Sequence, residues 1–354
     1  MTDTSDSDIS NADVSENHIL KTINIQHLVM SSGVIYGFTF FGILKKMHQT
    51  GKINLFDLQS IHATSVGSIM GTMMALWTIS PTLDASGGKI FEWDILENYM
   101  VHRPWQHVFQ FSLQNMINCY QKCGIFQKDI IKDILDSLFR SKDLDIATIT
   151  MQEFFDLTHI EMFFFTVELQ NFKIVNISHH THPNWCVLDA IYASSCAPIL
   201  FTPHENDSIK YTDGGFLVHY PMNYCLQWCD EHEYARDTVF GIHLLSHGVV
   251  IPQQEPIDLV TEPKKFTLLD YFYTLTKHFY HIYSQFTEAG TSYSDQEIRP
   301  YEINVPPTLH AMDVITVVRS HEERQKLIEY GYSLVRMAEC LRTVTSGHLI
   351  QLTS

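Results

Sequence analysis

The stretch Leu-Gln-Ser-Ile-His-Ala-Thr-Ser-Val-Gly, residues 58–67, decides the fold expected for this chain. Its first half predicts a short strand, and Thr64-Ser65-Val66-Gly67 predicts a tight turn. A helix is expected directly afterwards, before Pro81, because apolar side chains recur three or four positions apart. These side chains are Ile69, Met73, Leu76 and Trp77.

The same order of elements occurs just upstream. Residues 23–30 are a short apolar-rich run that predicts a buried strand, and Ser31-Ser32-Gly33 predicts a turn. From Tyr36 the apolar pattern becomes helical, and Gly51 ends the helix. Two successive strand–turn–helix units are typical of the beginning of a parallel α/β sheet.

Further strands extend the predicted sheet. A hairpin is expected around the tight turn Gln170-Asn171, between two β patterns. The remaining expected strands are buried runs nearer the C-terminus. In full, the strands expected after the second helix are 160–169, 172–177, 238–245 and 313–318.

Helical patterns fill the space between these strands. Residues 89–157 are mostly helical in pattern, and Thr150 with Glu153 forms a capping box inside this region. A last helix begins at Ser320. We therefore predict a three-layer α/β fold with a mostly parallel central sheet, as one domain over residues 21–345 with a helical insertion at about 85–157.

Composition and charge exclude several classes of protein. The 354 residues are 45% hydrophobic and 18% charged, which is typical of a globular chain. Acidic residues outnumber basic ones by 40 to 23, which gives a net charge of −17, and no segment is dense in Lys or Arg. We therefore expect no nucleic-acid partner and no broad electrostatic attraction to anionic membranes.

The N-terminal segment and the cysteines indicate the compartment. Residues 1–17 contain five acidic and no basic residues, which predicts a disordered acidic tail over residues 1–20 rather than a secretory signal. The apolar stretches fall far short of the ~20 residues of a spanning helix. Seven cysteines, an odd number that includes two CxxxC pairs, indicate a reducing compartment. The sequence therefore predicts an intracellular, cytoplasmic protein that is not secreted and has no transmembrane segment.

The first chemical signal is Ala63-Thr64-Ser65-Val66-Gly67. It matches the G-x-S-x-G nucleophile elbow, with Ala63 in place of the first glycine. The elbow needs small residues such as Ala63 and Gly67 on both sides of the serine, because the turn is cramped and strained. The alternative is that Ser65 only caps the N-terminus of the following helix, a common role for serine.

The second signal is Tyr211-Thr212-Asp213-Gly214-Gly215, ahead of a helix that starts at Pro221. A carboxylate followed by two glycines, here Gly214 and Gly215, is often an ordinary turn. A serine nucleophile, however, needs a base within hydrogen-bond reach, and the sheet could bring Asp213 there.

Together these segments resemble the patatin-like phospholipase family, from about His27 to Leu334. In that family a glycine-rich loop after the first strand precedes a long helix, the serine elbow follows, and a D-G-G/A turn comes much later. Residues 188–198, Leu-Asp-Ala-Ile-Tyr-Ala-Ser-Ser-Cys-Ala-Pro, look like the family's segment "DAIRASSAAP". The final strand and helix, ending near Tyr330-Gly331, also look like its C-terminal portion.

The resemblance implies a serine lipid acyl hydrolase with a Ser–Asp dyad, no catalytic histidine, and no metal or cofactor. Ser65 would attack an ester carbonyl of a phospholipid or related lipid, and Asp213 would take its proton and later activate water. An ordinary Asp pKa of about 3.9 is low for a base at pH 7, so the site needs partial desolvation. The implied partners are a lipid ester and, transiently, a membrane or lipid surface. An acyltransferase that uses the same acyl-serine intermediate is an alternative.

The oxyanion loop is where the sequence departs from the family. The family pattern S-G-G-G-x-[RK]-G is here Ser31-Ser32-Gly33-Val34-Ile35-Tyr36-Gly37. The resemblance places the oxyanion N–H groups at Gly33, Val34 and Ile35. Val34 is β-branched and is expected to keep a negative φ, which leaves fewer donors aimed at the oxyanion. A weakened or inactive relative that binds lipid or protein is therefore a second alternative.

Two other features have common structural explanations. His179-His180-Thr181-His182 could bind a metal, but we expect a solvated polar loop, because no Cys or acidic residue stands at ligand spacing beside it. The aromatic stripe in residues 268–286 could be a lipid-facing helix, although core packing explains such stripes more often.

Overall fold

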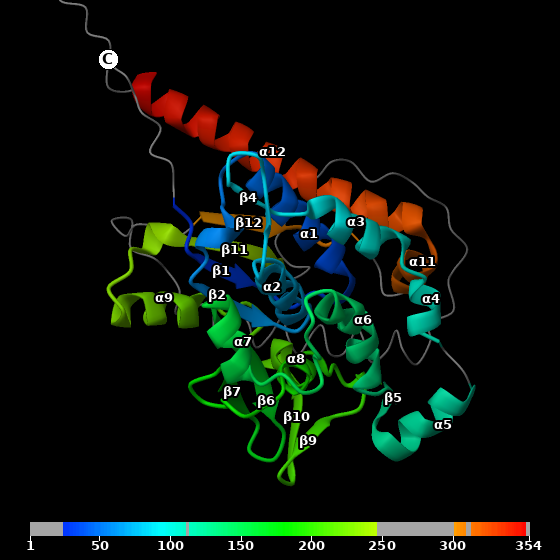
Figure 1. Ribbon diagram of the computed structural model, residues 1–354. Helices are drawn as coiled ribbons and strands as arrows, with labels where there is room; N and C mark the ends of the chain where they lie inside the picture. Colours follow the sequence, from blue (N-terminus) through cyan, green and yellow to red (C-terminus); the bar gives the residue numbers. More distant parts are fainter. Residues whose placement is uncertain (1–23, 111–112, 246–300, 309–312, 352–354) are drawn as a thin grey trace, which may run out of the picture.

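The computed structural model describes residues 24–110, 113–245, 301–308 and 313–351 (Figure 1). Within them, one 8-stranded sheet has the order β12-β11-β1-β2-β6-β10-β9, with β7 also paired to β6. The strands from β12 to β6 in this order are parallel, whereas β7, β9 and β10 pair antiparallel. The expected α/β fold with a mostly parallel sheet is confirmed. The bounds are β1 His27–Met30, β2 Ser60–Thr64, β6 Glu161–Glu168, β7 Lys173–Ile177, β9 His204–Asn206, β10 Ile209–Asp213, β11 Val239–Leu244 and β12 Tyr301–Val305.

Helices cover both faces of the sheet, because side chains alternate along each strand and the central strands are apolar on both sides. In β1, Leu28 and Met30 join the large core cluster, while Val29 packs with residues of α9. The large cluster also contains the apolar residues of α1, α2 and α8, so these helices share the first face. Their bounds are α1 Gly37–Gln49, α2 Val66–Trp77, α8 Val187–Ser195 and, on the second face, α9 Met222–Glu231.

The long C-terminal helix α12, His321–Gln351, lies along α1 at the outside of the molecule (Figure 1). The two backbones approach closely, since a Cβ at Gly42 would lie 2.1 Å from the carbonyl oxygen of Ile328. The expected cap at Ser320 is present, because its Oγ accepts the N–H of Glu323 at 3.3 Å.

Between α2 and β6 the chain is mostly helical, as expected. The predicted capping box is present at α7, where Thr150 Oγ1 accepts the N–H of Glu153 at 3.1 Å and Glu153 Oε2 accepts the N–H of Thr150 at 2.9 Å. A short strand of this region, β5, pairs in parallel with β8, Ile199–Phe201. The elements are β3 Thr82–Leu83, β4 Lys89–Ile90, α3 Trp93–His102, α4 Trp105–Val108, α5 Leu113–Lys122, β5 Gly124–Phe126, α6 Asp129–Arg140 and α7 Met151–Thr158.

One expected strand is wrong. Residues 313–318 lie in the helix α11, Asp313–Arg319, and the sheet ends instead at β12. The β-branched residues of this segment favour a strand by propensity, but Val317 and Val318 enter the core from a helix, so tertiary packing overrides propensity. In β12 the first, third and fifth residues are buried, an alternation with the period of a strand.

Two further expectations, the acidic tail over residues 1–20 and the aromatic stripe in residues 268–286, lie outside the described residues.

Candidate active site

Ser65 lies on the turn between β2 and α2. Its φ of 56° and ψ of −125° fall in a region that residues other than glycine rarely occupy. Such a strained strand-to-helix turn is typical of a nucleophile elbow. The side chain of Ser65 makes no capping hydrogen bond to α2, so the N-cap alternative does not describe it.

Close packing explains the small residues around Ser65. A Cβ at Gly67 would lie 2.7 Å from the carbonyl oxygen of Met30 and 2.8 Å from that of Ser31. The first turn of α2 therefore presses against the end of β1, and any side chain at Gly67 would push the helix away. Ala63, on the other side of the serine, is fully buried in the large core cluster.

The ends of β2 and β10 meet on β6, and this meeting brings Asp213 to Ser65. Thr64, the last residue of β2, pairs with Phe165 in parallel, and Asp213, the last residue of β10, pairs antiparallel with Thr166. Because Phe165 and Thr166 are consecutive, Ser65 and Asp213 are neighbours in space although 148 positions separate them.

Ser65 and Asp213 are directly hydrogen bonded. Ser65 Oγ donates to Asp213 Oδ2 at 2.5 Å, and Asp213 Oδ1 accepts the N–H of Gly215 at 2.7 Å. Both side chains are buried. Within the described part of the chain, no histidine forms a hydrogen bond with either residue. The geometry is that of a Ser–Asp pair rather than a triad.

The electrostatics of Asp213 suit a general base. Burial raises the pKa of Asp213 from 3.8 to about 6, although the hydrogen bonds from Ser65 and Gly215 act in the opposite direction. A carboxylate with a pKa near 6 is mostly ionised at pH 7 and is a stronger base than an ordinary aspartate. The expected partial desolvation of the site is therefore present.

The turn after Asp213 depends on glycine. A Cβ at Gly214 would lie 2.1 Å from the carbonyl oxygen of Phe165, and a Cβ at Gly215 would lie 2.9 Å from Asp213 Oδ1. The backbone after Asp213 therefore packs directly on β6 and on the carboxylate. This close approach gives a steric reason for the two glycines of the D-G-G turn.

Two serines of α8 hold the elbow in place, a role that the sequence analysis missed. The N–H of Ser65 donates to Ser194 Oγ at 3.0 Å, and Ser194 Oγ donates to the carbonyl oxygen of Phe165 at 2.8 Å. Ser195 Oγ donates to the carbonyl oxygen of Ser65 at 3.1 Å. Both serines belong to the 188–198 segment that carried the family resemblance, but only the fold shows what they contact.

The loop after β1 contradicts one prediction. Val34 has a φ of 45°, in the left-handed region, and not the negative φ expected of a β-branched residue. Its side chain is 54% exposed, so the branched Cβ does not pack against a neighbour on every side. Tyr36 fixes the loop from the other end, since its OH accepts the N–H of Thr308 at 2.6 Å and its N–H donates to Gly33 O at 2.9 Å. These contacts offset the strain of about 1–3 kcal/mol that a left-handed non-glycine residue carries.

The loop runs beside both halves of the dyad. A Cβ at Gly37 would lie 2.7 Å from Val66 Cγ2, next to the elbow, and a Cβ at Gly215 would lie 2.9 Å from Ser32 Oγ. Three backbone N–H groups of the loop have no acceptor among the described residues. They are the predicted donors Gly33, Val34 and Ile35.

His219 contacts this loop rather than the dyad. Its Nε2 donates to the carbonyl oxygen of Leu244 at 2.8 Å, so its Nδ1 accepts the hydrogen bond of Ser32 Oγ. The N–H of Ser32 also donates to the carbonyl oxygen of His219 at 2.8 Å. Burial lowers the pKa of His219 to about 4, so the ring is neutral at pH 7. His219 thereby fastens the start of the oxyanion loop.

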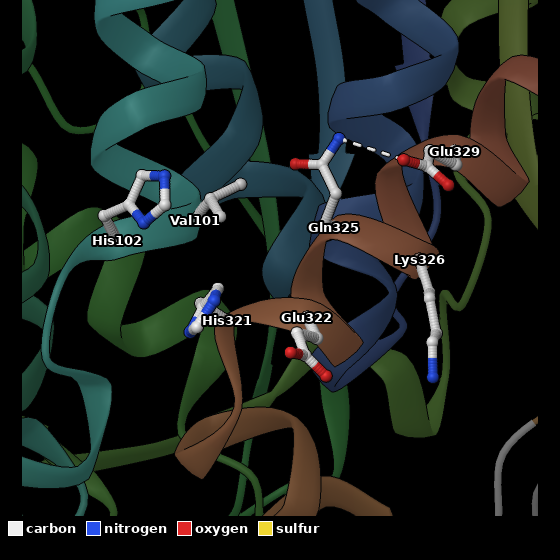
Figure 2. Close-up of a pocket in the computed structure, with 7 residues that line it drawn as sticks. All are labelled: Val101, His102, His321, Glu322, Gln325, Lys326 and Glu329. Carbon is white, nitrogen blue, oxygen red and sulfur yellow. Dashed lines mark hydrogen bonds between the residues drawn. The ribbon is translucent and has the colours of Figure 1, made fainter.

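A surface pocket between α3 and α12 is separate from these residues (Figure 2). On α12, Gln325 Nε2 donates to Glu329 Oε1, one turn further along the same helix, at 3.3 Å. A fatty acyl chain needs predominantly apolar walls, and only one of the lining side chains is apolar. The lining residues are Val101, His102, His321, Glu322, Gln325, Lys326 and Glu329.

Comparison with known proteins agrees with this geometry. The family model described as patatin-like phospholipase matches residues 28–226, more than half of the chain. An uncharacterized protein of Acanthamoeba polyphaga mimivirus is 25% identical over 198 residues, which are 56% of this chain and 60% of that protein. The similarity thus spans less than two thirds of this relative's length.

Two solved structures are distantly similar. VipD from Legionella pneumophila is 14% identical with a TM-score of 0.41, and the match covers 89% of this chain and 67% of VipD. The ExoU–SpcU complex from the type III secretion system of Pseudomonas aeruginosa gives 11% identity and a TM-score of 0.35, covering 89% of this chain and 52% of the matched chain. The family match spans both the serine elbow and the D-G-G turn, and the chain belongs to the patatin-like phospholipase family.

Proposed function

We propose that this protein is a serine lipid acyl hydrolase that cleaves fatty-acyl esters of phospholipids or related lipids. The observation that carries the proposal is the 2.5 Å hydrogen bond from Ser65 Oγ to Asp213 Oδ2 at a strained strand-to-helix turn. Membership in the patatin-like phospholipase family supports lipid esters as the substrate class.

Acylation uses the hydrogen bond of the dyad. Ser65 Oγ attacks the ester carbonyl carbon while its proton moves to Asp213 Oδ2, because the two atoms are already in contact. The carbonyl oxygen becomes an oxyanion and accepts hydrogen bonds from the loop N–H groups. The tetrahedral intermediate then collapses, the C–O bond to the alcohol breaks, and Asp213 returns the proton to the departing oxygen. Ser65 remains as an acyl ester.

Deacylation repeats these steps with water. Asp213 takes a proton from a water molecule, whose oxygen attacks the acyl carbon. The second tetrahedral intermediate expels Ser65 Oγ, which regains its proton from Asp213, and the fatty acid leaves. No step needs a metal or cofactor.

The oxyanion loop supports catalysis over the binding-module alternative. With φ at 45°, Val34 keeps the backbone in the region that favours glycine, the residue of the family pattern. The N–H groups of Gly33, Val34 and Ile35 can then converge as the family's do. Each oxyanion donor is worth about 10²–10³ in kcat.

The proposal includes a transient contact with a lipid surface and an intracellular site of action. Among the described residues, none of the helices combines the length and the apolar character that crossing a bilayer requires. The six described cysteines carry free thiols.

Labelling with a fluorophosphonate tests the proposal. The wild type should form a covalent adduct at Ser65, and Ser65→Ala should form none. Ser68→Ala is the matched control, because Ser68 lies on the same helix and its Oγ donates to the carbonyl oxygen of Ser65 rather than to Asp213. A wild type that neither labels nor releases fatty acid from phospholipid vesicles contradicts the proposal and favours a binding module.

The assay of fatty-acid release from phospholipid vesicles also separates hydrolysis from acyl transfer. Product analysis with a lysolipid or alcohol acceptor shows whether the acyl group goes to water or to the acceptor. Free fatty acid as the main product at high acceptor concentration is the result expected of a hydrolase.

A further inference from the structure

Glu161, His179 and His180 form a polar cluster at the end of β6 that is remote from the dyad. Glu161 is the first residue of β6, whereas the dyad is held at Phe165 and Thr166. The two histidines lie in the turn after β7, which pairs with β6. Strand pairing therefore brings an acidic side chain to the histidines, although the sequence around them contains none.

The three donor atoms are spaced for one metal ion. Glu161 Oε2 lies 3.1 Å from His179 Nδ1 and 3.1 Å from His180 Nε2. All three atoms lie within 4.8 Å of one another. In a tetrahedral zinc site with bonds of about 2.0–2.2 Å, ligand atoms are roughly 3.3–3.5 Å apart. A single ion can therefore contact all three atoms after small movements.

Two of these atoms, Glu161 Oε2 and His179 Nδ1, are buried. Within the described part of the chain their polar neighbours are other atoms of this cluster, at 3.1 Å, and neither atom makes a hydrogen bond of good geometry. His179 is only 8% exposed, and its ring stacks on Phe155 with centroids 3.9 Å apart. The expectation of a solvated loop is therefore wrong for His179. Buried polar groups without well-aligned partners are costly, and one cation would satisfy both atoms.

We propose that Glu161 Oε2, His179 Nδ1 and His180 Nε2 bind a divalent transition metal of the zinc type. Two imidazoles and one carboxylate are a donor set that Zn²⁺ takes, with a further position for water. The His180 side chain is 55% exposed, so solvent reaches this side of the cluster. The ion fastens the turn after β7 to the first residue of β6.

The metal has no part in ester cleavage. Phe165 lies four positions after Glu161 along β6, which is about 13 Å of extended strand. The site therefore stabilises the fold, and its test does not depend on the proposed lipid hydrolysis.

Zinc binding by the full chain tests the proposal. Metal-stripped protein is dialysed against Zn²⁺, and bound zinc is measured by mass spectrometry for the wild type, Glu161→Gln and His180→Asn. His182→Asn is the matched control, because His182 lies in the same turn and its Nδ1 contacts Thr181 Oγ1 instead. Wild type and His182→Asn should bind one more equivalent than the other two. The zinc affinity of Glu161→Gln and His180→Asn at that site should be lower than that of the wild type by more than about 100-fold. Losing a residue that only supports a ligand typically costs about 10–100-fold, so a larger loss indicates a direct ligand.

Cobalt gives a second readout of the same site. Co²⁺ bound by the wild type should show the intense visible absorption of a four-coordinate site, and Glu161→Gln should lose it. Equal zinc stoichiometry and affinity in all four proteins would place the metal on other histidines and overturn the proposal. A wild type that binds no zinc would overturn it as well. If Glu161→Gln fails to fold by circular dichroism, His180→Asn decides, because its side chain is exposed.

Discussion

Strand β6 has a polar site at each end, and the two sites differ in how their carboxylates are satisfied. At its C-terminal end, Asp213 accepts hydrogen bonds from Ser65 and Gly215. At its N-terminal end, Glu161 Oε2 and His179 Nδ1 lie 3.1 Å apart, without a hydrogen bond of good geometry among the described residues. Burial raises the pKa of the carboxyl group at both ends, but within the described part of the chain only at the first end does each carboxylate oxygen, here of Asp213, accept a hydrogen bond. The same strand thus supports a hydrogen-bonded Ser–Asp pair at one end and the proposed metal ligands at the other.

The largest expected effect is a difference in ester turnover between substitutions at the two ends of β6. Asp213→Asn should reduce ester turnover by at least about 10³-fold, within the range that a general base contributes. Glu161→Gln should leave turnover unchanged, because it lies at the other end of the strand. Fatty-acid release from mixed vesicles measures both variants. Equal losses in the two variants would mean that turnover reports stability rather than chemistry.

The second prediction concerns stability, where the substitution of Asp213 that lowers turnover should stabilise the fold. The pKa of Asp213 is raised from 3.8 to about 6, so the folded state favours the neutral acid and the unfolded state ionises more readily. Ionised Asp213 therefore destabilises the fold, with no cost below about pH 4 and the full cost above about pH 6. Two units correspond to about 3 kcal/mol, so Asp213→Asn should be more stable than the wild type at pH 8 by up to this amount.

Urea unfolding at pH 8 and pH 4 measures this effect. The gain of Asp213→Asn should vanish at pH 4, where the wild-type carboxyl is already neutral. The free energy of unfolding of Glu161→Gln, in contrast, should differ from the wild type most strongly when zinc is present. An Asp213→Asn variant that is less stable than the wild type at pH 8 would show that its hydrogen bonds outweigh desolvation.

The pH dependence of turnover sharpens the comparison further. The base must be ionised, so kcat/KM should fall about tenfold per pH unit below the Asp213 pKa of about 6 and level off above it. Glu161→Gln should give the same profile as the wild type. A shifted midpoint in that variant would reveal electrostatic coupling along β6.

The smallest expected effect concerns the oxyanion loop. Val34→Gly should relieve the strain of about 1–3 kcal/mol, while the greater freedom of glycine in the unfolded chain costs roughly 0.5–1 kcal/mol. The net expectation is a stabilisation of about 1 kcal/mol, read from thermal unfolding, with turnover retained. A clear loss of stability would mean that the Val34 side chain makes contacts that its exposure does not suggest.

Local patterns predicted most of what surrounds the dyad. The strand, the turn and the helix around Ser65 follow from residues close together in sequence, and so do the hairpin and the capping box. The pairing of Ser65 with Asp213 was predicted from the family resemblance and not from local patterns. The register of β2 and β10 on β6 creates that contact, and no local pattern contains this register. The domain limits at residues 21 and 345 stay a prediction.

The failures have a common physical origin. The segment 313–318 has strand propensity but packs as helix α11. Val34 has an intrinsic preference for negative φ that its neighbours override. Glu161 and His179 meet only because β6 and β7 are adjacent. In each case contacts between distant segments decide the outcome, and no short window of sequence contains them.

The pairing of β2 and β10 with consecutive residues of β6 has a consequence for engineering. The distance between Ser65 and Asp213 is set by the register of three strands and not by the covalent chain that joins them. A break or an inserted tag in an exposed turn of that connection, such as the β3–β4 hairpin, should therefore leave the reactive pair intact. Two fragments that carry Ser65 and Asp213 separately, mixed in solution, should report their assembly on β6 through the proposed ester hydrolysis.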